Sequence, residues 1–188
     1  MNPLPDAINA AVATFRTLAA LEEPLGRAAE VITNCLKSGH KLLVCGNGGS
    51  ASDGADFAGE FACRFVEDRR PYPAINIADG GGLMTAIGND YGFDEVFARQ
   101  VWAFGQSGDV LVVFTTSGNS RNTIRALEEA ARRGVKSIAF LGRDGGACRG
   151  IADVELIVHG TATARIQEAH KFLAHVLCEI VEGTLPRE

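Results

Sequence analysis

The chain has 188 residues, a formal net charge of −5 and 46% hydrophobic residues, so it is long and apolar enough to form a globular core. No basic run suggests a nucleic-acid-binding surface, and no apolar stretch reaches the roughly 18 residues of a membrane span. Glycine is frequent at 22 residues, yet proline is scarce and no G-x-y period occurs. This excludes a disordered or collagen-like chain and predicts that the glycines mark specific backbone positions.

The expected location follows from the N-terminus and the cysteines. The first residues have neither the basic nor the apolar region of a signal peptide. The cysteines are scattered and form no C-x-x-C pair, which favours reduced and mostly buried thiols. They are Cys35, Cys45, Cys63, Cys148 and Cys178. These features predict a cytoplasmic protein.

Residues 3–38 carry apolar side chains three and four positions apart, which predicts two helices, with Pro24 between them and Gly39 as the stop signal. Beyond residue 40, short apolar runs alternate with helical patterns. The runs predict strands at residues 41–46, 73–78, 109–115, 137–142 and 154–158. The helical patterns cover residues 50–65, 83–87, 94–104, 121–133 and 164–181. This alternation predicts a parallel sheet covered by helices on both faces, with ligands bound at the carboxyl ends of the strands.

Two of the predicted strands end in loops that are suited to binding an anion. Residues 45–52 read CGNGGSAS, and residues 114–120 read FTTSGNS. Each loop runs into the N-terminus of a helix, where free backbone N–H groups and the helix dipole favour negative charge. Hydroxyls of Thr115, Ser117 and Ser120 add donors, so these loops can hold phosphate without a lysine.

Other interpretations of these loops stay open. Ser, Thr and Asn are also the ordinary residues of turns and helix N-caps. Gly46-x-Gly48-x-x-Ala51 matches the dinucleotide fingerprint G-x-G-x-x-G/A, but the acidic residue expected about 20 residues later is missing. The nearest candidate, Asp79, lies about 30 residues beyond the loop. A Walker A loop is excluded, because no G-K-[ST] follows.

Acid, base and metal candidates lie on two of the predicted helices. Asp56 and Glu60 are four residues apart and therefore share one helical face. Gln167 and His175 differ by about 80° around the last helix and can share a broad face, whereas His170 lies about 140° from His175 and should face elsewhere. The first four could form a zinc site, or Glu60 and His175 an acid–base pair. A solvated acidic face and a packed or surface histidine are the alternatives.

Several segments, in the same order, resemble the phosphoheptose isomerases of the sugar isomerase (SIS) domain family. They are CGNGGS, DFAGEF, AIGNDYGF, TTSGNS and RIQEAHKFLAH, and with the N-terminal helices the resemblance covers nearly the whole chain. It implies a three-layer α/β/α SIS fold with a five-stranded parallel sheet. The expected domain is a single one over residues 1–188, with an N-terminal helical extension at 1–38 and an α/β core with the C-terminal helix at 41–183.

The resemblance also implies an activity and an assembly. The expected reaction converts the ketose sedoheptulose 7-phosphate to the aldose D-glycero-D-manno-heptose 7-phosphate through an enediol, with Glu60 as the base and His175 as the acid–base group. This step would make a heptose precursor of lipopolysaccharide or related glycans in the cytoplasm. A homotetramer with active sites between subunits is expected, and neither nucleic acid nor membrane is expected as a partner.

The family motifs extend the site to further residues by position. The expected substrate contacts are Asn47, Gly48, Gly49, Ser50, Arg64, Asn89, Asp90, Thr115, Thr116, Ser117, Ser120 and Gln167. One zinc ion per subunit would be held by Asp56, Glu60, Gln167 and His175. Asp56 departs from the pattern, because zinc-binding members usually have histidine there, and a carboxylate changes the affinity for zinc. The run Gly80-Gly81-Gly82 also departs from the polar residues expected at that place.

Different functions remain open at this point. A heptose isomerase, or an isomerase of another sugar phosphate, needs both Glu60 and His175. A non-enzymatic SIS adaptor that binds the bacterial replication initiator tends to lack the glutamate. A regulatory sugar-phosphate sensor needs the phosphate loop but not Glu60. The presence of both residues favours the enzyme.

Overall fold

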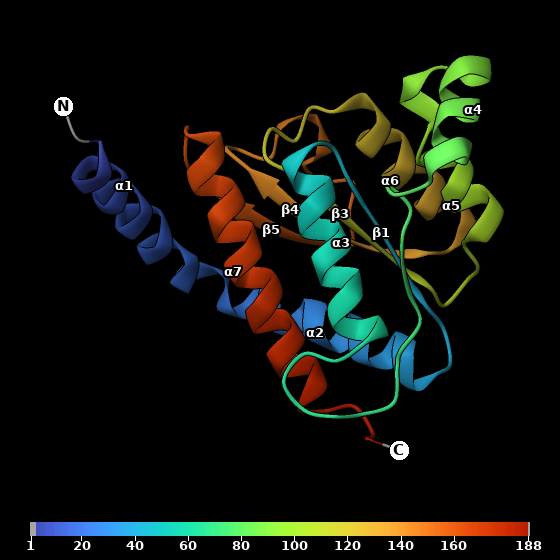
Figure 1. Ribbon diagram of the computed structural model, residues 1–188, viewed down its shortest axis with the longest axis horizontal. Coiled ribbons are helices and arrows are strands. Elements are labelled where there is room, and N and C mark those ends of the chain that lie inside the picture. Colours follow the sequence, from blue (N-terminus) through green and yellow to red (C-terminus); the bar gives the residue numbers. More distant parts are fainter. Residues whose placement is uncertain (1–2, 188) are drawn as a thin grey trace.

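One parallel sheet organises the chain (Figure 1). The computed structural model describes residues 3–187, so Met1, Asn2 and Glu188, which fall within the expected domain bounds, lie outside the described residues. All five strands are parallel and lie in the order β2-β1-β3-β4-β5. Their bounds are Leu42–Gly46 (β1), Ala74–Asn76 (β2), Val110–Thr115 (β3), Lys136–Gly142 (β4) and Val154–Val158 (β5).

Helices cover both faces of the sheet, as parallel strands require. The helices are α1 (Leu4–Thr17), α2 (Glu22–Lys37), α3 (Gly49–Ala62), α4 (Gly81–Tyr91), α5 (Ala98–Phe104), α6 (Arg121–Arg133) and α7 (Thr163–Glu182). On one face lie α2, α3 and α7, and on the other α4, α5 and α6. The expected three-layer fold with N-terminal helices is confirmed. Within residues 3–187, no helix combines the length and apolarity needed to cross a membrane.

The central strands are apolar along their length because both of their faces are covered. Every residue of β1 and β3 is buried, and in β4 only Lys136 is not. Phe114 and Phe140 stack with ring centroids 4.3 Å apart, and Phe57 of α3 packs edge-on against both. Each buried ring of this size contributes about 2–3 kcal/mol, which anchors α3 to the sheet. The five cysteines are free thiols, and all but Cys63 are buried, as expected.

Some local expectations are corrected. Pro24 lies in the first turn of α2 rather than between two helices, and the break is the 3₁₀ turn η1 (Leu18–Leu21). Proline is tolerated in a first turn because the N–H that it lacks would have no intrahelical partner. The strand β2 is shorter than expected, since this edge strand pairs only with β1. Residues 94–104 are divided between the 3₁₀ turn η2 (Phe93–Glu95) and α5.

The glycine run at 80–82 begins α4. Gly80 is the N-cap of this helix, and Gly81 has a φ of +42°. A Cβ on Gly80 would lie 3.0 Å from Met84 Cγ and 3.4 Å from Oε1 of the buried Gln100. The run therefore lets the start of α4 pack closely against α5.

Helices α3 and α7 lie side by side and run in the same direction (Figure 1). Each begins at the carboxyl end of a parallel strand and returns along the same face of the sheet. Successive turns of α3 therefore contact successive turns of α7. In order, Gly49 lies against Gln167, Asp53 pairs with Lys171, and the charge of Glu60 acts on Cys178. Just beyond the end of α3, the N–H of Phe65 donates to Glu182. We call this contact surface the α3–α7 seam.

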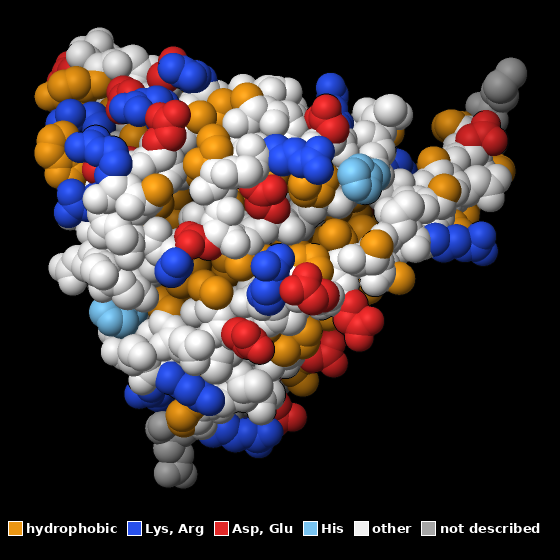
Figure 2. Space-filling model, turned by 180° about the vertical axis from the view of Figure 1, so that it is seen from behind, with side chains coloured by type: hydrophobic (Ala, Val, Ile, Leu, Met, Phe, Trp, Pro, Cys, Tyr) orange, Lys and Arg blue, Asp and Glu red, His pale blue; other side chains and the backbone are white. Residues whose placement is uncertain are grey.

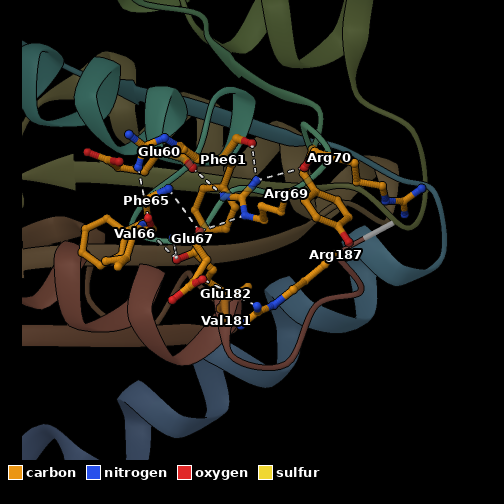
Figure 3. Close-up of polar contacts among 12 residues, drawn as sticks. Glu60, Phe61, Phe65, Val66, Glu67, Arg69, Arg70, Val181, Glu182 and Arg187 are labelled. Carbon is orange, nitrogen blue, oxygen red and sulfur yellow. Dashed lines mark hydrogen bonds and ion pairs between the residues drawn. The ribbon is translucent and has the colours of Figure 1, made fainter.

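A buried ion pair locks the far end of the seam (Figure 3). Arg69 Nε donates to Glu182 Oε1 at 3.0 Å, and the two side chains are only 2% and 8% exposed. The guanidinium also donates to the carbonyls of Glu60 and Phe61, and so caps the last turn of α3. The Glu182 carboxylate accepts the backbone N–H groups of residues 65–67. Burial opposes ionisation, but these N–H groups and Arg69 hold the pKa of Glu182 below its usual value.

His170 faces the sheet and is fully buried. Its Nε2 lies 3.0 Å from the carbonyl oxygen of Leu141, so the neutral ring carries its proton on Nε2. Burial lowers its pKa from 6.5 to about 4. His175, by contrast, is exposed. The expectation that these two histidines face different ways is confirmed.

Replacing Glu182 with Gln should lower the free energy of unfolding by about 3 kcal/mol, because the buried Arg69 then lacks its counter-charge. Urea unfolding followed by circular dichroism measures this change. Glu67→Gln is the matched control, since Glu67 pairs with Arg187 at 3.5 Å between exposed side chains, and its loss should cost less than about 0.5 kcal/mol. Equal effects of the two substitutions would contradict the locking role of the buried pair.

The buried His170 should make the fold sensitive to acid. The unfolded residue gains a proton as the pH falls below about 6.5, whereas the folded ring stays neutral down to about pH 4. Its contribution to stability is therefore complete above pH 6.5 and is lost as the pH falls toward 4. Between about pH 7 and 4.5 the wild type should lose about 2 kcal/mol more than His170→Gln, which cannot titrate. Urea unfolding across this range measures the difference, and parallel curves would refute it.

Candidate functional site

The order in which the chain adds its parallel strands to the sheet reverses between β1 and β3. From β1 the chain moves outward to β2, and it then returns across β1 to β3. The helix after β1, α3, packs on one face, and the helix after β3, α6, packs on the other. The two connecting loops therefore diverge and leave a crevice at the carboxyl ends of these strands, where open parallel sheets bind ligands. These are the same two loops that the sequence indicates as anion sites.

A cavity of about 180 Å³ lies in this crevice, and both loops line it. Polar side chains surround one phenylalanine in its wall: Asn47, Ser50, Phe114, Thr115, Thr116, Ser117 and Ser120. All of the polar members are expected substrate contacts. Gly48 and Gly49, also expected, form the start of α3 beside the cavity, and Gly48 has a φ of +57°.

Hydrogen bonds hold the loops in shape while donors remain for an anion. The side-chain amides of Asn47 and Asn122 bond to each other at 2.8 and 2.9 Å and tie the first loop to α6. Thr115 Oγ1 accepts the N–H of Gly118 at 3.2 Å. Ser120 is the N-cap of α6, but its hydroxyl makes no cap bond, and first-turn N–H groups of a helix lack intrahelical partners. A helix end of this kind presents donors and a positive dipole that suit an anion such as phosphate.

Gly118 fixes the shape of the second loop. It has a φ of +65°, and an added Cβ would overlap the carbonyl oxygen of Gly145, in the loop that follows β4. Its own carbonyl accepts the N–H of Cys148 at 2.9 Å. The loop is thus clamped to the neighbouring strand-end loop at a point where only glycine fits.

The start of the α3–α7 seam borders this cavity. A Cβ on Gly49 would overlap the amide of Gln167, so this expected contact lies directly against the first loop. One turn farther along α7, Lys171 Nζ lies 2.5 Å from Asp56 Oδ2 and 3.2 Å from Asp53 Oδ1. A second cavity of about 400 Å³ opens beside this cluster.

The charges of this cluster depend on one another. Burial raises the pKa of Asp53, while Lys171 and Gln167 favour its ionised form. Asp53 Oδ2 has no hydrogen-bond partner among the described residues. Burial lowers the pKa of Lys171, but its bonds to Asp56 and Asp53 outweigh this and raise it. The ammonium is therefore charged at neutral pH.

Glu60 and His175, the expected acid–base pair, lie farther along the seam. Glu60 is half-buried on α3, and His175 is exposed on α7. The charge of Glu60 acts on Cys178, which is one turn beyond His175. The ring of His175 lies 5.7 Å from that of Phe65, just after α3. Both residues of the pair therefore border the same stretch of the seam.

The expected zinc ligands share the seam, and one of them is paired with a cation in this structure. Asp56 is already bonded to the Lys171 ammonium, which would repel a dication placed there. Across residues 3–187, no three His, Cys, Asp or Glu side chains lie close enough to hold a metal ion. An Asp56 carboxylate paired with an ammonium suits a dication poorly, and zinc binding stays a prediction.

Three expected substrate contacts lie apart from the cavity within one chain. Arg64 donates to the carbonyl of Val66, and the Asn89 amide donates to the Asp90 carboxylate at 2.8 Å. All three are exposed. Their contact with a substrate stays a prediction.

Three residues of this site, Asp53, Lys171 and Asn122, were not sequence candidates. Lys171 lies four residues after Gln167 and four before His175, so the helical-face argument that groups those two could have included it. Asn122 has no such signal, because its partner Asn47 is 75 residues away in the chain.

The chain is similar to known proteins over most of its length. Residues 7–142 match the model of the SIS domain. The phosphoheptose isomerase of Shewanella baltica (strain OS155) is 46% identical over 169 residues, 88% of this chain and 86% of that protein. A solved phosphoheptose isomerase from Francisella tularensis is 37% identical with a TM-score of 0.93, and the match covers 97% of this chain and 100% of that one. A solved phosphoheptose isomerase from Neisseria gonorrhoeae is 40% identical with a TM-score of 0.90, over 96% of this chain and 97% of that one.

Gly118→Ala should weaken the binding of inorganic phosphate by about tenfold, because the added methyl group must push the second loop away from Gly145. Isothermal titration calorimetry measures the affinity. Gly150→Ala is the matched control: its φ is +82°, but nothing lies within 4 Å of an added Cβ. That control bears the same backbone strain and should keep wild-type affinity. A Gly118→Ala protein that binds phosphate as well as the control would show that this loop does not hold the anion.

Proposed function

The chain belongs to the SIS domain family and, within it, to the phosphoheptose isomerases, and on this premise we propose that it converts sedoheptulose 7-phosphate to D-glycero-D-manno-heptose 7-phosphate. One observation carries the proposal: a cavity with phosphate-binding chemistry opens at the start of the α3–α7 seam, and the seam continues to Glu60 and His175. An anchor for phosphate and an acid–base pair are the two parts that a sugar-phosphate isomerase needs.

The phosphate group is held at the two loops. The hydroxyls of Thr115, Ser117 and Ser120 and the first-turn N–H groups of α6 surround it. Because these donors are neutral and fixed by the backbone, the acidic chain binds an anion without a basic patch. Binding energy gained at the phosphate holds the distant carbons in position for proton transfer.

Glu60 and His175 divide the proton transfers between them. Glu60 takes the proton from C1 to give the enediol and returns it to C2. His175 donates a proton to O2 and removes the proton from O1, so the ketose becomes an aldose with no net gain or loss of atoms. The half-buried site of Glu60 and the exposed ring of His175 on the same seam support this division. We propose that no step uses a metal ion, since Asp56 is paired with the Lys171 ammonium.

The spacing along the seam suits a long sugar phosphate. Ser50, at the phosphate cavity, and Glu60 are ten residues apart on α3, which corresponds to about 15 Å along the helix axis. An open-chain heptose 7-phosphate spans about 10 Å from C1 to phosphorus, and the Glu60 side chain leans back toward the N-terminus of α3. A triose phosphate, at about 5 Å, is too short to bridge the two.

We also propose a homotetramer with active sites completed between subunits. In Figures 1 and 2, α1 projects from the body of the molecule with hydrophobic side chains on its surface. Ile8 and Val12, one turn apart, are 52% and 44% exposed. A second copy that covers this face would remove it from water. The expected contacts Arg64, Asn89 and Asp90 would then meet a substrate bound by a neighbouring subunit.

The biological role follows from the proposed reaction. The aldose product would serve as the heptose precursor of lipopolysaccharide or a related glycan. We place this step in the cytoplasm, where the resemblance to the phosphoheptose isomerases locates it.

Glu60→Gln should lower kcat for sedoheptulose 7-phosphate by about 10³-fold, because the amide cannot accept the C1 proton. The fold and the affinity for inorganic phosphate should stay unchanged. Product formation followed by NMR gives the rate, and circular dichroism and calorimetry check the rest.

Glu30→Gln is the control for this variant, since Glu30 is an exposed residue of α2, a helix that carries none of the proposed site residues. It should keep the wild-type rate. Near-normal turnover by Glu60→Gln would exclude Glu60 as the base. A wild type that isomerises other ketose phosphates in a panel, but not sedoheptulose 7-phosphate, would show that the named substrate is wrong.

A further inference from the structure

The α3–α7 seam carries a cation of its own at its centre. On α7, Lys171 lies one turn after Gln167 and one turn before His175. On the facing side, its ammonium bonds to Asp56, which lies one turn before Glu60. The ammonium thus contacts one of the four residues that were expected to hold zinc, and Lys171 lies between two others along α7.

The Lys171–Asp53 pair is partly enclosed, whereas the Asp56 carboxylate is 64% exposed. The Lys171 side chain is 28% exposed, and Asp53, its second partner, is 6% exposed. Solvent screens such a charge less than one on the surface. Zinc could enter only if Lys171 left both carboxylates, and the departing ammonium would leave Asp53 buried without its counter-charge.

The ion pair with Lys171 explains why this chain has Asp56 where zinc-binding members of the family usually have histidine. A neutral imidazole is a good zinc ligand but offers no counter-charge to an ammonium. A carboxylate at the same position forms a charge-assisted hydrogen bond with Lys171 instead. Asp56 and Lys171 are therefore complementary to each other, and this pair is a poor match for a zinc ion.

We infer that Lys171 is an internal cation that takes the place of a metal ion, so that this isomerase is metal-independent. The inference rests on the proposed function, since it concerns the same site. Two of the three N–H donors of the ammonium are occupied by Asp56 and Asp53, which leaves one for an oxygen of the substrate. There it stabilises the negative charge that develops on oxygen as the enediol forms.

The first test is the metal content of the wild-type protein, measured by inductively coupled plasma mass spectrometry after purification with and without added zinc. We expect well below about one metal ion per chain. Treatment with a chelator should leave turnover of sedoheptulose 7-phosphate within about twofold, and added zinc should not raise the melting temperature. About one tightly held zinc ion per chain, with turnover lost on chelation and restored by zinc, would overturn the inference.

The second test converts the site. Asp56→His combined with Lys171→Ile removes the ammonium and restores the imidazole, and it should bind about one zinc ion per chain and melt at a higher temperature when zinc is added. Asp56→His alone keeps the ammonium and should bind none. Zinc binding by this single variant would contradict the inference. Lys136→Met, which removes a lysine paired with Asp153 at 2.7 Å on the surface, is the matched control and should resemble the wild type in metal content and turnover.

The third test removes the charge alone. Lys171→Met should lower turnover by about 10²-fold, whereas Lys171→Arg, which keeps the positive charge, should recover part of it without binding metal. A Lys171→Met enzyme with wild-type turnover would overturn the inference. Failure of the proposed function is distinguishable, because an inactive wild type leaves the metal content and the zinc-dependent melting shift as readouts of the internal cation.

Discussion

All five strands of the sheet point the same way, and the arrangement of the site depends on this constraint. It brings the loops after β1 and β3 to one edge, where the reversal of strand order separates them into a crevice. It also sends α3 and α7 in the same direction along one face, so that residues four apart on one helix meet residues four apart on the other. The seam therefore forms a continuous track from the phosphate cavity to the Arg69–Glu182 pair.

Different interactions hold different parts of this track. At its start, backbone N–H groups, hydroxyls and a helix dipole provide positive potential without a charged side chain. In the middle, the Lys171 ammonium balances carboxylates of α3. At the far end, Arg69 caps the helix that carries Glu60 and joins it to Glu182 of the helix that carries His175. The proposed acid and base are thus held by a buried pair that takes no part in the chemistry.

Local patterns predicted most of the fold and part of the site. Apolar runs of strand length indicated the five strands, and the glycine and hydroxyl residues after two of them indicated the loops that line the cavity. Helix periodicity was enough to separate the buried His170 from the exposed His175. It failed at Pro24, because a proline that interrupts a pattern can also start a helix. The zinc expectation came from helical spacing and from a resemblance at four positions, and neither took account of Lys171.

By itself, the sequence determined which residue types share each helical face, which loops can bind an anion, and which family the chain resembles. Only the tertiary structure decided which faces meet. Asp56 and Lys171 are 115 residues apart, and Arg69 and Glu182 are 113 apart, so no local period connects them. The physical reason is that helix periodicity depends on neighbours within a turn or two, whereas the partner of a face depends on the order and direction of the strands. That order places Lys171 next to Asp56, and it therefore determines the charge at the centre of the site.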